Sequence, residues 1–141
     1  MVIVPNIAPD TPPLKKNPLF LYTEDGFKKP TPFQPDIAVD ITSVFDQKIY
    51  AIAAHESQFF EWLPWTSGKL NEVPKTEADR LKWLAEWRNP GINDKVKESL
   101  IKWYGNEKAS QAKYAEAFEI CEYGGRPTDD DIKMLFPMLG K

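Results

Sequence analysis

The length, composition and charge of this 141-residue chain exclude several classes of protein. With 42% hydrophobic and 13% aromatic residues, it has enough apolar side chains to build a core, so disorder along its whole length is not expected. Its formal net charge of −3, with both signs interspersed, argues against nucleic-acid and acidic-membrane partners, which require a basic stripe.

The first 41 residues predict strands and loops. Eight of the 13 prolines lie before residue 36, and because each fixes φ and removes a backbone donor, no helix is expected there. Two short apolar runs, Leu19–Tyr22 and Ile37–Ile41, predict buried strands joined by a turn at residues 24–26 and a proline-rich loop. Two short strands make a poor sheet on their own. We therefore expect them to need strand partners that this chain does not contain.

Residues 42–141 predict mainly helices. Thr42 or Ser43 is expected to cap an amphipathic helix of about four turns, whose apolar face runs from Phe45 to Phe60. An aromatic-rich loop over residues 62–68 should end this helix. Its sequence places tryptophans on both sides of a proline.

Two more helices follow from start and stop signals. Thr76, with an acidic residue three positions later, predicts the beginning of a helix that stops at Pro90. Another should run from about residue 93 to Tyr104, with Gly105 in the left-handed conformation that ends many helices.

The last 35 residues contain one ambiguous segment and one clear helix start. Residues 107–123 favour a helix at their beginning and an extended strand at their end. Thr128 is expected to cap a short helix whose inward side chains are Ile132, Leu135 and Phe136.

The sequence offers almost no material for a catalytic centre. A catalytic zinc ion normally takes three protein ligands, and this chain has one histidine, His55, and one cysteine, Cys121, 66 positions apart. Two carboxylates would have to join His55, and no spacing supports that. No nucleophile elbow and no phosphate-binding glycine loop occurs. We therefore predict no metal ligand and no catalytic residue.

The stretch around His55 is the most informative. On a continuous helix, Lys48 and His55 lie about two turns apart at the border of the apolar face. Glu56 would project into that face, where an unpaired carboxylate is costly. His55 then belongs to a buried structural hydrogen-bond network, faces a cleft where it contacts a substrate or orients a ligand, or is solvated without a role.

This stretch carries a resemblance to a known family. The residues Asp40-Ile41-Thr42, Lys48, Ala51, Ala54-His55 and Ser57-Gln58 resemble the C-terminal signature of PIG-L/LmbE-like zinc-dependent N-deacetylases. Three further stretches are similar to a longer bacterial branch of the family: residues 17–22 with 33–36, residues 115–119, and residues 122–124 with 135–137. The resemblance thus covers nearly the whole chain.

The resemblance implies an α/β fragment, the C-terminal part of a Rossmann-like domain, with short strands near the N-terminus followed mainly by helices. The family hydrolyses the acetamide of N-acetylglucosamine-type sugars with a zinc-bound water and an aspartate base. Its Ala-His-Pro-Asp-Asp-Glu motif and a later histidine motif supply zinc ligands and base, and neither occurs here. Residues 1–6 look like the interior of the family domain. We therefore expect 1–141 to be a partial domain, divided into 1–41 and 42–141, with zinc belonging to the complete domain.

Several residues are candidates for contacts with a substrate. Glu116 is either buried for structural reasons or lines the site. Trp83 and Trp87 are expected in the core or an interface, whereas the tryptophans beside the loop proline are better placed to stack on a sugar. The candidate site residues are His55, Lys48, Gln58, Glu116, Trp62 and Trp65.

These features leave three functional hypotheses. The first is a deacetylase-family segment that is inactive alone, or active only with a complementary N-terminal half, and that contacts a small sugar or self-associates. The second is a standalone helical module that binds a protein or glycan without catalysis. The third and weakest is an independent hydrolase that uses His55 and carboxylates. A cytoplasmic location is favoured, since no signal peptide or transmembrane segment is recognised.

Overall fold

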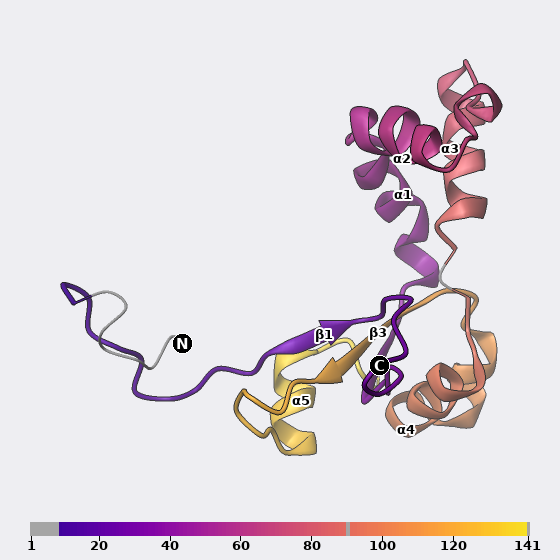
Figure 1. Cartoon of the computed structure of the whole chain (residues 1–141). Coiled ribbons are helices and arrows are strands. Elements are labelled where there is room, and N and C mark those ends of the chain that lie inside the picture. The colour runs from indigo at the N-terminus through magenta and orange to yellow at the C-terminus, as the bar shows by residue number, and fades with distance from the viewer. Residues whose placement is uncertain (1–8, 90, 141) are drawn as a thin grey trace. The chain divides into compact units, whose positions relative to one another are not determined.

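A computed structural model describes residues 9–89 and 91–140, which belong to two compact units (Figure 1). Unit 1 comprises residues 1–39, 93–111 and 116–141, and unit 2 comprises residues 40–92 and 112–115. The predictions for residues 1–6 and for Pro90 lie outside the described residues. No helix in the described part of the chain is both long and apolar enough to cross a bilayer.

Unit 1 is built on a three-stranded antiparallel sheet, so the chain is a mixed α/β protein, as predicted. Its strands are β1 (Leu21–Thr23), β2 (Ile37–Asp40) and β3 (Ala115–Ile120), in the order β1-β3-β2. Strand β3 lies beside β1 in antiparallel register, with Tyr22 opposite Glu119 (Figure 1). Both predicted strands are confirmed. The expectation that their partner lies outside this chain is wrong, because β3 pairs with both.

The two predicted strands differ in burial. In β2 the side chains of Ile37 and Ala38 are fully buried, as predicted. Strand β1 is not buried: Tyr22 is 49% exposed. Strand β1 lies at one edge of the sheet and pairs only with β3. At the other edge, the indole of Trp103 donates a hydrogen bond of 2.9 Å to the carbonyl of Asp36, just before β2.

The helices of unit 1 follow their sequence signals closely. Helix α4 (Asp94–Gln111) is kinked at Gly105, whose φ of 80° is the predicted left-handed conformation. Segment 107–123 is therefore helical up to Gln111 and then forms β3. Helix α5 (Asp129–Leu135) begins with a capping box between Thr128 and Asp131. The inward prediction is wrong for Leu135, which is 54% exposed because only one narrow face of this short helix is covered.

Unit 2 is helical, with short 3-10 and π segments between its α-helices. Its elements are η2 (Thr42–Val44), α1 (Phe45–Ala53), η3 (Ser57–Trp62), α2 (Leu63–Thr66), η4 (Leu70–Glu72) and α3 (Glu77–Trp87). Helix α3 is confirmed, and the hydroxyl of Thr76 accepts the N–H of Asp79 as predicted. The continuous helix predicted from residue 42 is wrong, since α1 ends at Ala53 and the chain leaves helical geometry before η3.

The predicted cap of the first helix is also wrong. Helix α1 has Val44 as its N-cap, with no side-chain hydrogen bond. The hydroxyl of Thr42 instead accepts the N–H groups of Lys113 and Tyr114, at 2.9 and 3.3 Å. The ring of Tyr114 stacks on the buried Phe45, with centroids 3.7 Å apart. Thr42 is therefore used to fasten the segment 112–115 to unit 2 rather than to begin a helix.

Candidate functional site

Most of the predicted site residues lie in unit 2. Glu116 is the exception, because it lies in unit 1, where it is half-buried on β3. Lys48 is half-buried within α1. The other four candidates lie within eleven consecutive positions and are exposed: His55, Gln58, Trp62 and Trp65.

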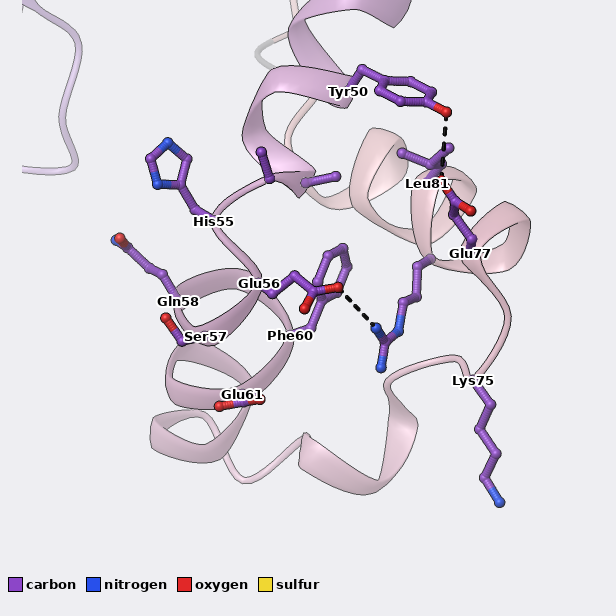
Figure 2. Close-up of a pocket in the computed structure, with 13 residues that line it drawn as sticks. Tyr50, His55, Glu56, Ser57, Gln58, Phe60, Glu61, Lys75, Glu77 and Leu81 are labelled. Carbon is purple, nitrogen blue, oxygen red and sulfur yellow. Dashed lines mark hydrogen bonds and ion pairs between the residues drawn. The ribbon is translucent and has the colours of Figure 1, made fainter.

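The chain breaks its helix at His55. The N–H of His55 donates to the carbonyl of Ile52 at 3.0 Å, which closes the last turn of α1. Its own carbonyl accepts the N–H groups of Gln58 and Phe59, at 3.1 and 3.0 Å, which begins the next helical stretch. His55 thus sits at the junction, and its imidazole projects outward from the turn (Figure 2). The interpretation of His55 as part of a buried network is wrong, because the helix break turns this side chain to the surface.

The helical stretch after His55 opens into a π turn. The N–H of Leu63 bonds to the carbonyl of Gln58, five residues earlier, instead of four. Pro64 supplies the physical reason: it has no N–H to donate, and its ring would clash with the carbonyl of residue 60 in a regular α-helix. A wider turn relieves that clash while Pro64 stays buried. Single π turns inside helices often mark functional sites.

Aromatic and polar side chains gather on the outer side of this stretch. A shallow groove of about 610 Å³ is lined by Ser57, Gln58, Glu61, Trp62, Trp65 and Leu70. The two indoles are 55% and 66% exposed. The aromatic loop predicted here is wrong in its conformation: residues 63–66 are helical, and the chain turns only at Gly68, whose φ is 70°. We call the exposed set of His55, Ser57, Gln58, Glu61, Trp62 and Trp65 the 55–65 face.

A second and larger concavity, of about 940 Å³, lies between η3 and α3 (Figure 2). It shares Ser57, Gln58 and Glu61 with the groove, and these three side chains follow one another along one side of the helical stretch (Figure 2). Its remaining polar lining includes Tyr50, His55, Glu56, Lys75, Glu77 and Arg80. The 55–65 face therefore separates two concavities of unit 2 and contributes to both.

Arg80 holds the larger concavity together. Its Nε–H donates to the carbonyl of Pro74 at 2.9 Å, and its guanidinium lies 5.0 Å from the centroid of the Phe60 ring. Its Nη1 lies 3.8 Å from a carboxylate oxygen of Glu56 (Figure 2). The prediction that Glu56 points into the apolar sector is wrong, since its side chain is 74% exposed and faces Arg80. The helix break changes its direction.

Trp83 and Trp87 pack against aromatic neighbours; Trp83 is half-buried, whereas Trp87 is 40% exposed, so a core position is not confirmed for Trp87. Trp83 lies 6.3 Å from Phe60 and 5.0 Å from Trp87, measured between ring centroids. Trp87 also meets Phe59 edge-on at 6.0 Å. These aromatic contacts pack α3 against η3, the segment that carries most of the 55–65 face.

Sequence reasoning missed two residues of this site. Glu61 could have been found, because Gln58, Glu61 and Trp65 follow helical spacing once the helix is continued past residue 62. Arg80 had no such signal. It reaches the site from α3, and no local pattern predicts which helix will pack against η3.

The residues present do not fit a zinc site. Within residues 9–89 and 91–140, no three His, Cys, Asp or Glu side chains are grouped so that they could hold a metal ion. The described residues therefore lack the ligand set that the family resemblance implies, and no chemical step is assigned to zinc here. The 55–65 face can hydrogen-bond through amide, imidazole and carboxylate groups and can stack through two indoles.

Comparison with known proteins gives no matching family model, no matching curated protein and no matching solved structure. The function is therefore inferred from the residues of this chain alone. In unit 2, those residues form an exposed aromatic and polar face over two concavities.

Proposed function

We propose that this chain is the C-terminal segment of a PIG-L/LmbE-like N-deacetylase with a Rossmann-like domain, and that its 55–65 face binds the sugar substrate. The residues that carry the family resemblance support this proposal. Ala54-His55 and Ser57-Gln58 are at the helix break, where the side chains of His55 and Gln58 are exposed at the edge of the larger concavity.

One observation carries the proposal: Gln58, Trp62 and Trp65 line the same groove. A pyranose ring has an apolar face of C–H groups and a rim of hydroxyls. Exposed indoles offer a flat apolar surface for the first, and a side-chain amide both donates and accepts hydrogen bonds for the second. Sites for small ligands commonly combine apolar walls with a few polar groups in this way.

In this proposal the segment binds and orients the substrate. Hydrolysis of the acetamide belongs to the part of the family domain that carries the zinc ligands and the catalytic base. A complementary N-terminal half is then the expected partner, and the cytoplasm, where the single buried thiol of Cys121 stays reduced, is the proposed compartment.

Titration with an N-acetylglucosamine oligomer, followed by NMR, tests the sugar-binding face on the intact chain. We expect chemical-shift changes confined to residues around the groove, and a double variant, Trp62→Ala with Trp65→Ala, should lose them. Trp87→Phe is the matched control, because Trp87 contacts Phe59 and Trp83 and does not line the groove. Unchanged binding by the double variant would contradict the assignment of the face.

Addition of a family N-terminal half tests the enzymatic part. We expect acetate release only when both pieces are present, and less release with the double tryptophan variant. If the chain binds the oligomer but never supports acetate release, the proposal of a deacetylase segment is wrong.

The second candidate, a glycan- or protein-binding module without catalysis, is favoured by the exposure of Trp62 and Trp65, since a groove that is open on one side suits an extended ligand. Binding that persists unchanged after the N-terminal half is added, with no acetate released, would select this candidate. Size-exclusion chromatography over a range of concentrations distinguishes self-association through the same indoles.

A further inference from the structure

We infer that the groove on the 55–65 face prefers the free-amine form of an amino sugar to the N-acetylated form, because Glu61, Trp62 and Trp65 together recognise an ammonium group. This inference rests on the proposed sugar-binding role of the groove. It adds which chemical form of the sugar the groove holds.

The three side chains come from one helical stretch. Glu61 and Trp62 end the π segment η3, and Trp65 follows in α2. All three line the groove, and their side chains are exposed. Two exposed indoles and one exposed carboxylate therefore line the same groove.

The charged side chain that lines the groove is negative. Glu61 is the single charged residue that lines it, and no ion pair joins Glu61 to another residue in the described part of the chain. The cations of the larger concavity, Lys75 and Arg80, do not line the groove. Glu56 in that concavity forms the ion pair with Arg80, at 3.8 Å.

A protonated amine fits this arrangement better than an acetamide. Hydrolysis of an acetamide consumes water, releases acetate and leaves an amine, which takes up a proton near neutral pH. An ammonium group is attracted to the face of an indole and to a carboxylate, whereas a neutral acetamide gains neither interaction. The groove therefore suits a sugar residue that has already been deacetylated, next to one that still carries its acetyl group.

The test compares three ligands by NMR titration of the intact chain at about pH 6, where carboxylates are ionised and amines are protonated. The ligands are a glucosamine dimer, its N-acetylated counterpart and tetramethylammonium chloride. We expect the glucosamine dimer to bind roughly tenfold more tightly than the acetylated dimer, since one or two exposed cation–π contacts and an exposed ion pair add up to about that factor. This preference should weaken as salt is added.

Variants that remove one negative charge test whether Glu61 causes the preference for the free amine. Glu61→Gln should reduce the preference to about twofold to sevenfold, because the cation–π contacts remain, and leave binding of the acetylated dimer unchanged. Glu98→Gln is the matched control, because Glu98 is exposed on α4 and does not line the groove. It removes the same charge and should keep the full preference.

The possible failures are distinguishable. If the acetylated dimer binds as tightly as the free amine, or if Glu61→Gln keeps the preference, the inference is wrong while the sugar-binding proposal stands. If neither dimer binds, both are wrong. If tetramethylammonium binds as tightly as the glucosamine dimer, the groove recognises the positive charge and not the sugar, and the assignment to amino sugars is overturned.

Discussion

Substitution of Arg80 by alanine should loosen the packing of α3 against η3. The arginine makes three contacts at once: a hydrogen bond of 2.9 Å to the carbonyl of Pro74, a cation–π contact at 5.0 Å with Phe60, and an ion pair at 3.8 Å with Glu56. Its side chain is 35% exposed, so these contacts are partly shielded from water.

The contacts differ in strength. A hydrogen bond from a charged donor contributes about 1.5–3 kcal/mol, and a cation–π contact near the surface contributes about 0.5–1 kcal/mol. The ion pair contributes under about 0.5 kcal/mol, because the carboxylate of Glu56 is 74% exposed and the distance is long. Since contacts of one side chain are not additive, we expect Arg80→Ala to cost about 2–3 kcal/mol.

Urea unfolding of unit 2, monitored by tryptophan fluorescence, measures this cost. With a slope of about 1.5–2 kcal/mol/M, the midpoint should fall by about 1–2 M. Arg80→Lys keeps the charge but loses the planar geometry at Nε, so it should be nearly as damaging. Glu56→Gln removes the ion pair alone and should change the midpoint little. If Glu56→Gln were as damaging as Arg80→Ala, the ranking of the three contacts would be refuted.

Three more predictions concern the two units separately. Gly124→Ala should destabilise unit 1 by about 1–3 kcal/mol in urea unfolding, because the added Cβ would lie 2.9 Å from backbone atoms, whereas Gly26→Ala meets nothing within 4 Å and should be close to neutral. Phe45→Ala should cost about 3–5 kcal/mol in the same assay, since the ring is 4% exposed, and Phe45→Leu should cost less. Hydrogen bonds from Thr128 hold the pKa of the Asp131 carboxyl below its usual value. The stability that this gives is present above about pH 4 and is lost as pH falls through the lowered pKa, so the difference between the natural chain and Asp131→Asn should shrink on acidification; a difference that grew instead would contradict the capping box.

The parts of the fold that the sequence predicted correctly depend on neighbouring residues. Thr76 and Thr128 begin helices because a hydroxyl and a backbone N–H three positions later are already close together in the chain. Gly105 adopts a positive φ because it alone in its segment lacks a Cβ. Such local signals predict helix ends without information on tertiary packing, and the structure confirms them at all three positions.

The parts that were missed depend on residues far apart in sequence. Strand β3 pairs with β2 from about eighty residues later in the sequence, and with β1 from about a hundred residues later. Its apolar and acidic alternation was compatible with a helix as well. At His55, six apolar residues at helical spacing predicted one continuous helix, and no local signal marks the break. Farther along, Pro64 favours the π turn of η3. The site was therefore predicted in composition, through Gln58 and the two exposed tryptophans, but not in shape.

The small segment 112–115 determines when unit 2 can finish folding during synthesis. The ring of Tyr114 stacks on Phe45, and the hydroxyl of Thr42 accepts hydrogen bonds from the backbone of the same segment. The packing of unit 2 is therefore completed by residues that are synthesised after the whole of α4. Until then the Phe45 ring lacks its stacking partner. A released chain truncated after residue 92 should therefore be cleaved by proteases faster than one truncated after residue 120. Any excised fragment meant to carry the groove by itself needs an apolar substitute for the missing tyrosine.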